Sequence, residues 1–437
     1  MMKFYDRESE MDILKKNRDM SKNSGVFTVI TGRRRIGKTT LIQESEKDRE
    51  FLYLFVLRGS ESLLCEQLVK NAGSDIGLKL FNTNRFRDLF EQLMIYGQEN
   101  NFTFVIDEFQ DLERVNGSII SSIQELWDKY KSTSKMNLIV CGSIYSMMIR
   151  IFEREKEPLF GRATSKLNVS PFRPSVIKQI LRDHNPNFEP DDLLFMYMVT
   201  GGVPKYIELL MDAGATDMES MLDLVCAQDS QFMTDGKDIL ISEFGKEYGT
   251  YFSILQLIAN GKNTMGEINT SINKESGPYL ENLEKEYGLL RRSRPIFSKD
   301  NSRNIRWKIS DNYLRFYFRF ISSNLSLIEL KRYDLLRERI LTEYKQYSGS
   351  VLEDYFKEKI AEEERITEIG SYWDRTGQNE IDIIALNDMT TKPTAIVAEV
   401  KRNPKKADVE ELKTKAGSIS DLKAFDAEFR ILSLDDV

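Results

Sequence analysis

The segment GRRRIGKTT, from Gly32 to Thr40, constrains this chain more than any other stretch. It fits the pattern G-x-x-x-x-G-K-[ST], and it lies between an apolar run, Val26 to Ile30, and a predicted helix that begins at Thr39. Glycines at these positions let the backbone fold into a nest of N–H groups that can hold phosphate oxygens. A strand, a glycine-rich turn and a helix in this order predict an α/β fold with a phosphate-binding edge.

The same segment indicates which residues would hold a nucleoside triphosphate. Lys38 would reach the β and γ phosphates, and the hydroxyl of Thr39 would face a magnesium ion, because this cation prefers oxygen ligands. ATP and Mg²⁺ are therefore the expected cofactors. The residues predicted to bind the nucleotide are Gly32, Arg33, Arg34, Arg35, Ile36, Gly37, Lys38, Thr39 and Thr40.

Residues 25 to 160 alternate β-branched apolar runs with segments of helical periodicity. The runs GVFTVIT, FLYLFVL, FTFVID and NLIVCGS are typical of buried strands. Helices are expected from Thr39, near residues 85 to 98 and near residues 117 to 131. Such alternation predicts a parallel sheet that is covered by helices on both faces.

Acidic side chains follow directly after one of these strands, in the segment FTFVIDEFQ. Asp107 would complete the magnesium site, and Glu108 would orient or deprotonate the attacking water. Another strand, LIVCGS, ends at Ser143, whose hydroxyl could sense the γ-phosphate or the water. The alternative for the two carboxylates is a helix cap after a buried strand.

Composition excludes several other classes of protein. The net charge of -7 argues against a nucleic-acid binder that is basic along its whole length. Three scattered cysteines give neither a disulfide framework nor a zinc knuckle, and one histidine, His184, gives no catalytic triad or multi-histidine metal site. No apolar run approaches the roughly 20 residues of a membrane span, so we expect a cytoplasmic protein without a membrane partner.

Taken together, the segments FYDRESEMDIL, GRRRIGKTTLI, VIDEFQ, PLFGRAT and TGGVPKYI resemble the archaeal-type P-loop ATPases of the AAA+ and STAND group. The resemblance implies that Arg162 is an arginine finger, which in a homo-oligomer would act on a neighbour's γ-phosphate. It also implies that Phe4, Tyr5 and Arg7 lie near the adenine or a domain seam. Lys205 stands in the lid motif where this family more often has arginine. The alternative for Arg162 is a simple pair with a carboxylate.

The middle of the chain predicts three short amphipathic helices and a hairpin, which is a winged-helix pattern. The hairpin, residues 291 to 308, is basic and favours contact with the phosphate backbone of DNA. Its basic residues are Arg291, Arg292, Arg294, Lys299, Arg303, Arg306 and Lys308. The helix that would read a groove carries Glu275, Glu281, Glu284 and Glu286 on or beside it, so a protein-docking role is the alternative.

Near the C-terminus, the predicted strands NEIDIIAL and AIVAEVKR carry Asp382, Glu399 and Lys401. Alternate side chains of a strand face one way, so Glu399 and Lys401 share a face. Two carboxylates and a lysine suit metal-assisted hydrolysis of phosphodiesters, with Lys401 as a catalytic cation. The segment resembles the PD-(D/E)XK nuclease fold, which implies a further metal ligand in Glu353, on a helix that begins near Ser350. The alternative is a solvated, charged strand face.

The sequence therefore predicts an α/β protein in which a P-loop sheet with a helical lid precedes a winged helix and a small restriction-endonuclease-like domain. The expected function is an ATP-hydrolysing switch coupled to DNA binding and a nuclease. The alternative is an ATP-dependent signalling or scaffold protein whose C-terminal domains bind protein. The predicted domains are residues 1–170 (core), 171–245 (lid), 246–310 (winged helix), 311–345 (helical connector) and 346–437 (nuclease-like).

Overall fold

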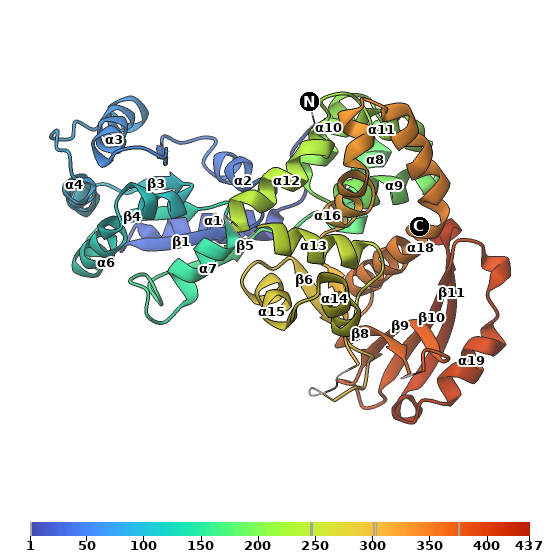
Figure 1. Cartoon of the computed structure of the whole chain (residues 1–437). Coiled ribbons are helices and arrows are strands. Elements are labelled where there is room, and N and C mark those ends of the chain that lie inside the picture. Colours follow the sequence, from blue (N-terminus) through green and yellow to red (C-terminus); the bar gives the residue numbers. More distant parts are fainter. Residues whose placement is uncertain (1, 245–247, 300–301, 303, 375) are drawn as a thin grey trace. The chain divides into compact units, whose positions relative to one another are not determined.

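The computed structural model describes residues 2–244, 248–299, 302, 304–374 and 376–437. These residues form two compact units. One is the continuous stretch Asp6–Ser170, and the other joins Met1–Tyr5 to Pro171–Val437. Figure 1 shows the first unit in blue to teal and most of the second in green to red. The division into five domains stays a prediction, and its boundary at residue 245 lies outside the described residues.

A five-stranded parallel sheet forms the centre of the unit Asp6–Ser170, as the sequence predicts for an α/β fold. The strands lie in the order β2-β3-β4-β1-β5. The interior strands are buried apolar runs, because a parallel sheet covered on both faces leaves no side for polar residues. The strands are β1 Val26–Thr31, β2 Leu52–Phe55, β3 Phe102–Asp107, β4 Met136–Cys141 and β5 Ser165–Asn168.

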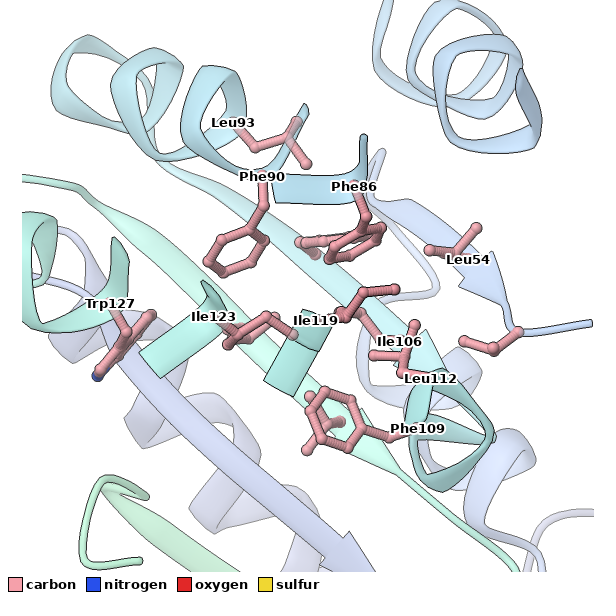
Figure 2. Packing of buried hydrophobic residues seen from close by; sticks show 14 of the residues in the cluster. Leu54, Phe86, Phe90, Leu93, Ile106, Phe109, Leu112, Ile119, Ile123 and Trp127 are labelled. Atoms are coloured by element: carbon pink, nitrogen blue, oxygen red, sulfur yellow. The ribbon is translucent and has the colours of Figure 1, made fainter. Parts of the chain in front are cut away.

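Helices cover this sheet, and α3, α4 and α6 all contribute side chains to the main hydrophobic core. Figure 2 shows core side chains of α4, such as Phe90, packed near those of α6, such as Ile123. Phe86 and Phe90 of α4 and Trp127 of α6 are among its buried side chains. Helix α1 contacts strands β1 and β4. The helices are α1 Glu8–Ser21, α2 Lys38–Ser45, α3 Glu61–Ile76, α4 Phe86–Glu99, α5 Leu112–Val115, α6 Ser118–Tyr130 and α7 Tyr145–Glu153, with the 3₁₀ turn η1 Phe109–Asp111 after β3.

From Pro171 to Phe244, five helices follow one another in the region where a helical lid is expected, and the lid assignment itself stays a prediction. Three of them start with a proline, whose fixed φ suits the first helical position. These helices are α8 Pro174–His184, α9 Pro190–Thr200, α10 Pro204–Asp212, α11 Met218–Val225 and α12 Gln231–Phe244.

The middle segment contains the three helices and the antiparallel hairpin that the sequence predicts. These elements are α13 Tyr248–Ala259, α14 Met265–Ile272, α15 Gly277–Lys285, β6 Leu290–Ser293 and β7 Arg306–Ile309. Part of the predicted turn between the strands, Asp300, Asn301 and Arg303, lies outside the described residues. The winged-helix assignment itself stays a prediction.

One long helix, α18 Tyr333–Glu363, differs from the expectation that a helix begins near Ser350. The Ser-Gly-Ser triplet at positions 348 to 350 suggests a break, but the helix continues through it. Ser350 Oγ donates to Tyr347 O, and Ser348 Oγ accepts from Arg402, so both hydroxyls are satisfied within the fold. Before it come α16 Asn312–Phe316, the π-helix η3 Tyr317–Ile321, the turn η4 Ser322–Asn324 and α17 Leu325–Glu329.

A small mixed sheet ends the chain, with strands in the order β11-β10-β9-β8. Strands β8, β9 and β10 run antiparallel in turn, while β10 and β11 are parallel. Helix α19 and the turn η6 pack on its apolar face, and α18 contacts β8, β9 and β10. The elements are β8 Glu368–Trp373, β9 Glu380–Asn387, β10 Thr394–Lys401, η5 Pro404–Lys406, α19 Val409–Gly417, η6 Asp421–Ala424, β11 Asp426–Ser433 and η7 Leu434–Asp436. Of the helices described, none is long and apolar enough to cross a membrane.

Candidate functional site

The glycine-rich loop leaves strand β1 at Thr31 and enters helix α2 at Lys38. Its two motif glycines have positive φ angles, 148° at Gly32 and 87° at Gly37. A Cβ atom on Gly32 would lie 2.7 Å from the carbonyl oxygen of Val169, which is closer than carbon and oxygen can approach. Glycine is therefore required at position 32 because any side chain would clash with the backbone of Val169.

The loop also holds its lysine in place. Lys38 is only 6% exposed, and its Nζ atom donates to the carbonyl oxygens of Gly32 at 2.7 Å and Arg33 at 2.9 Å. The ammonium group is thus bound by the loop that would hold the phosphates. Of the other predicted nucleotide residues, Ile36 is buried, Arg33, Arg35, Gly37 and Thr39 are half-buried, and Arg34 and Thr40 are exposed.

The loop and the acidic strand meet at the buried carboxylate of Asp107. Its Oδ2 atom accepts from Thr39 Oγ1 at 2.9 Å and from the Tyr53 hydroxyl at 2.7 Å. Its Oδ1 atom accepts from Cys141 Sγ at 2.9 Å and from the backbone N–H of Glu108 at 2.8 Å. Strands β2, β3 and β4 and helix α2 thus all contribute to one carboxylate, and each of these donors is neutral.

Two of these donors have perturbed acidity. Burial, and then the hydrogen bond to Asp107, raise the pKa of the Tyr53 hydroxyl. Burial, and then the charge of Asp107, raise the pKa of the Cys141 thiol well above its usual value. Both groups therefore keep their protons at neutral pH and remain donors.

Glu108 follows Asp107 with a left-handed backbone, φ 55° and ψ 42°. This conformation is costly for a residue with a side chain, and it occurs often at functional sites. The Oε2 atom of Glu108 accepts from Ser143 Oγ at 2.7 Å, from Ser143 N at 3.2 Å and from Gln110 Nε2 at 2.5 Å. The predicted base and the predicted sensor are thus brought together at the ends of β3 and β4.

The residues at this edge fit a magnesium ion. Thr39 and Asp107 supply a hydroxyl and a carboxylate oxygen 2.9 Å apart, and magnesium is commonly held by one or two carboxylates together with substrate phosphates. Among the residues that the structure describes, no three His, Cys, Asp or Glu side chains form a group that could hold a metal ion. A magnesium ion here would therefore take its other ligands from the nucleotide and water.

Arg162 lies far from this edge of its own sheet. Thr164, two residues on, bonds to Phe27 near the amino end of β1, whereas Gly32 follows the carboxyl end. Five residues of strand separate the two ends, about 16 Å at roughly 3.3 Å per residue. Arg162 Nη2 instead lies 2.8 Å from Asp128 Oδ2 on α6. This ion pair with a carboxylate is the alternative role that the sequence left open for Arg162.

The predicted entry box divides between the two units. Arg7, 5% exposed, donates from Nη2 to Ser170 O at 2.7 Å and from Nη1 to Glu10 at 3.2 Å. Tyr5 belongs to the other unit, where its hydroxyl donates to Asp183 at 2.9 Å, and Phe4 is 39% exposed.

The predicted lid motif lies at the junction of α9 and α10. Gly202 has a φ of 72°, and a Cβ atom there would lie 2.3 Å from the carbonyl oxygen of Phe172. Lys205 pairs with Glu208, one helical turn away, at 2.7 Å. The lysine thus has a partner on its own helix.

The basic hairpin is largely neutralised within its unit. Arg292 pairs with Glu284 of α15 at 2.6 Å, and Arg306 pairs with Glu380 of β9 at 2.6 Å. A third carboxylate, Asp354 of α18, receives two more cations of the hairpin, Arg291 at 2.9 Å and Lys308 at 3.6 Å. Lys299 is exposed, and Arg303 lies outside the described residues. Four of the predicted DNA-contacting cations therefore hold the hairpin to carboxylates of the same unit.

In the C-terminal sheet, Lys401 lies between the two predicted metal-binding carboxylates. Its Nζ atom is 2.8 Å from Glu399 Oε1 and 3.5 Å from Asp382 Oδ2, which confirms that Glu399 and Lys401 share a face. Lys415 of α19 approaches Glu399 at 3.8 Å. Burial lowers the pKa of Lys401, but the two carboxylates outweigh it and raise the pKa overall. The Oε2 atom of Glu399 is buried and has no hydrogen-bond partner among the described residues.

Glu353, on α18, is half-buried, and its side chain forms neither a hydrogen bond nor an ion pair with another described residue. Burial, and then the charge of Asp382, raise its pKa to about 7. Its neighbour Asp354 behaves oppositely. Burial would raise the pKa of Asp354, but Lys308, Arg291 and Arg315 hold it well below its usual range.

Sequence reasoning missed Tyr53, Cys141 and Gln110. Tyr53 and Cys141 come from strands whose pairing with β3 is known only once the strand order is known. The sequence did contain one usable signal for Gln110, because it follows the acidic pair by two residues in VIDEFQ.

Two stretches of the chain match known protein families. Residues 4–210 match a family described as an ATPase domain predominantly from Archaea. Residues 317–412 match archaeal and bacterial proteins of unknown function. The first stretch contains the glycine-rich loop, both acidic residues and the lid motif.

Whole-chain comparisons agree with these matches. The uncharacterized protein MJECL04 of Methanocaldococcus jannaschii is 33% identical over 417 residues, which cover 91% of this chain and 87% of that protein. The uncharacterized protein MJ0424 of the same organism is 36% identical over 56 residues, or 13% of this chain and 54% of that protein. The solved Walker-type ATPase PABY2304 of Pyrococcus abyssi has 19% identity and a TM-score of 0.55, covering 72% of this chain and 96% of that one. That likeness shows a shared fold.

Proposed function

This chain belongs to the family of ATPases found predominantly in Archaea, and we propose that it hydrolyses ATP with magnesium at the carboxyl edge of its parallel sheet. The observation that carries the proposal is the hydrogen bond between Thr39 and Asp107, 2.9 Å long. It joins the glycine-rich loop to the acidic strand. Phosphates on the loop and a magnesium ion on these two oxygens would be adjacent.

In this proposal each side chain has one task. The backbone N–H groups of the loop and Lys38 hold the phosphates, and Lys38 offsets the negative charge that moves to the leaving oxygen. Thr39 and Asp107 hold the magnesium ion, which when bound neutralises charge on the phosphates. Glu108 orients the attacking water and takes its proton, and Ser143 holds Glu108 in place.

Two substitutions test these roles. Lys38→Ala should abolish nucleotide binding, whereas Glu108→Gln should bind ATP with wild-type affinity and hydrolyse it about 10²- to 10⁴-fold more slowly. Equilibrium titration with a fluorescent ATP analogue and steady-state phosphate release measure the two effects. Wild-type hydrolysis by Glu108→Gln would remove Glu108 from its role.

Arg162 enters the proposal only as a residue that acts on another copy. It lies near the amino end of β1, and the strand from Phe27 to Gly32 is about 16 Å long, so its own γ-phosphate would lie at the opposite end of the sheet. We expect Arg162→Ala to lower turnover and spare affinity if a homo-oligomer forms. Mixing Arg162→Ala with Lys38→Ala should then restore part of the activity, since each supplies what the other lacks. An unchanged rate of hydrolysis in Arg162→Ala would exclude the finger role and leave the ion pair with Asp128 as the role of Arg162.

A second candidate function is the cleavage of phosphodiesters, DNA included, by the C-terminal sheet. The observation that favours it is the buried Oε2 atom of Glu399, beside Asp382 and Lys401, which has no hydrogen-bond partner in the described part of the chain. Carboxylate oxygens suit magnesium, and these two could hold it together with a phosphate of the substrate. Lys401 would supply positive charge near the phosphate. The alternative is a protein-binding module, which the pairing of Lys401 and of the basic hairpin favours.

Incubation of the purified protein with plasmid and Mg²⁺ or Mn²⁺, with and without ATP, separates these two functions. Nicking that disappears in Glu399→Gln would support cleavage. Calorimetric titration of the wild type and of Glu399→Gln with Mn²⁺ reports metal binding independently of activity. Absence of both nicking and Mn²⁺ binding in the wild type would favour the binding module.

A further inference from the structure

A buried amide lies beside the proposed catalytic base. Gln110, in the 3₁₀ turn η1, is 1% exposed and donates from Nε2 to Glu108 Oε2 at 2.5 Å. The amide can face only one way, because the opposite orientation would place its oxygen against a carboxylate oxygen. A hydrogen bond from a buried amide to a charged carboxylate is stronger than one between two neutral groups.

The space for this amide is supplied by a glycine from another strand end. A Cβ atom on Gly142 would lie 2.2 Å from Gln110 Oε1 and 2.6 Å from Met148 Sδ. Because φ at Gly142 is not in the left-handed region, the glycine is required for space and not for its backbone conformation. Gly142 precedes Ser143, which binds the same carboxylate oxygen.

The two oxygens of Glu108 are consequently not equivalent. Oε2 accepts three hydrogen bonds, two from Ser143 and one from Gln110. These bonds occupy the lone pairs of Oε2. Oε1 accepts no hydrogen bond from the described residues. When one oxygen of a carboxylate is fixed, the direction of the other oxygen is fixed as well. Holding a catalytic group in the correct orientation raises the rate of the reaction.

We propose that Gln110 is a positioning residue for ATP hydrolysis, which fixes Oε2 of Glu108 so that Oε1 is the oxygen that faces the attacking water. Gly142 serves the same purpose by leaving room for the amide. Gln110 does not touch the nucleotide in this account and acts only through Glu108. The inference rests on the proposed role of Glu108 as the base.

The test compares two substitutions that disturb the contact from opposite sides. Gln110→Met keeps the volume of the side chain and removes the donor, and Gly142→Ala leaves the amide intact but displaces it. Each should lower kcat about 10- to 100-fold, because a misplaced catalytic group loses its near-attack geometry. The affinity for ATP should stay at the wild-type value. Gln98→Met, at an exposed position of α4, is the matched control and should leave both quantities unchanged.

Combination of the substitutions adds a readout that a merely structural role would not give. If both act through the orientation of Glu108, the double variant should be no slower than the worse single variant. In a Glu108→Gln background, Gln110→Met should have no further effect on kcat. Thermal unfolding of each variant checks that the fold is intact, and Gly142→Ala carries the test alone if Gln110→Met unfolds.

Each outcome decides between the inference and its premise. Slow hydrolysis by Glu108→Gln, with wild-type kcat in both Gln110→Met and Gly142→Ala, would overturn the positioning role and leave the base in place. Loss of ATP affinity in parallel with kcat would also overturn it, because the effect would then be on the whole site. Wild-type hydrolysis by Glu108→Gln would overturn the base and its positioning together.

Discussion

The five-stranded and the four-stranded sheet of this protein both present a pair of carboxylates, but the pairs are held by different partners. Asp107 and Glu108 accept hydrogen bonds from hydroxyls, an amide, a thiol and backbone N–H groups. Asp382 and Glu399 are instead bridged by the ammonium group of Lys401. Neutral donors orient a carboxylate and leave its charge in place, whereas a lysine orients it and cancels part of that charge.

The difference separates a site that is ready for a cation from one in which a cation is already built in. At the first pair a magnesium ion needs to compete only with neutral hydrogen bonds. At the second pair it must displace, or share the carboxylates with, a lysine. The spacing of acidic residues along a sequence therefore does not by itself tell a metal site from an ion pair.

The largest effect is expected at the neutral-donor pair. Asp107→Asn removes the charge that would hold magnesium while keeping the shape of the side chain, so kcat for ATP hydrolysis should fall about a thousandfold or more. The matched change at the lysine-bridged pair, Glu399→Gln, should leave ATP hydrolysis at the wild-type rate. Phosphate release at saturating ATP measures both. Equal losses in the two variants would break the comparison.

The second prediction concerns the stability of the fold and the buried carboxylate of Asp354, which pairs with three cations. This carboxylate is 3% exposed and receives Arg291, Lys308 and Arg315, the last at 2.8 Å. Asp354→Ala would leave buried positive charge unpaired and should lower the free energy of unfolding by about 3–5 kcal/mol. Denaturant titration measures it. Asp334→Ala, an exposed pair with Arg332, is the control and should change little.

The same residue gives a pH dependence with a definite sign. The pKa of Asp354 is held well below its usual value in the folded protein, so its contribution to stability is present above the unfolded value of about 4. That contribution should be lost as the pH falls from about 4 toward the folded pKa. The stability of Asp354→Ala should depend less steeply on pH in this window. Identical pH profiles would show that the ion cluster does not stabilise the fold.

A smaller effect is expected at Lys401, whose side chain is 39% exposed. Lys401→Ala leaves two carboxylates facing each other, which should lower the free energy of unfolding by about 1 kcal/mol after screening by solvent. Added Mn²⁺ should restore the loss and should bind the variant more tightly than the wild type. Thermal unfolding with and without Mn²⁺ measures it, with Lys413→Ala as the surface control. Weaker Mn²⁺ binding in Lys401→Ala would mean that the lysine helps to hold the ion.

The smallest effect is expected for Tyr53→Phe, which deletes one neutral donor to Asp107. One hydrogen bond is worth about 0.5–1.5 kcal/mol, so the Mg²⁺ concentration for half-maximal ATP hydrolysis should rise about 2- to 12-fold. The kcat at saturating Mg²⁺ should be unchanged, because the carboxylate itself remains. Tyr130→Phe, which loses a hydrogen bond to Glu91 on the helical layer, is the control. A fall in kcat would place Tyr53 closer to the reaction.

The parts of the site that sequence predicts well are those in which a short segment fixes its own geometry. Gly32, Gly37 and Lys38 lie within one loop, and the steric demand for glycine is visible in their spacing. Asp107 and Glu108 follow a buried strand in the same direct way. The parallel sheet was likewise predictable, because its interior strands β1, β3 and β4 are buried apolar runs.

Other features depend on contacts between distant segments and could not be predicted in this way. Tyr53 reaches Asp107 only because β2 pairs with β3, and Gly142 matters only because Gln110 packs against it. The basic hairpin suggests a phosphate partner until its cations are found on Asp354, Glu284 and Glu380. Charge is visible in a sequence, but its neutralisation is a property of the fold.

The contact between Arg7 and Ser170 has a consequence for the chain as a module. These two residues lie at the ends of the continuous unit Asp6–Ser170, and Asp6 and Arg7 both have left-handed backbones, with φ of 57° and 81°. The hydrogen bond from the Arg7 guanidinium to Ser170 O therefore joins the first and the last turn of chain in this unit. A segment whose two ends lie close together can be inserted into another chain without distorting either one, and the unit Asp6–Ser170 has this geometry.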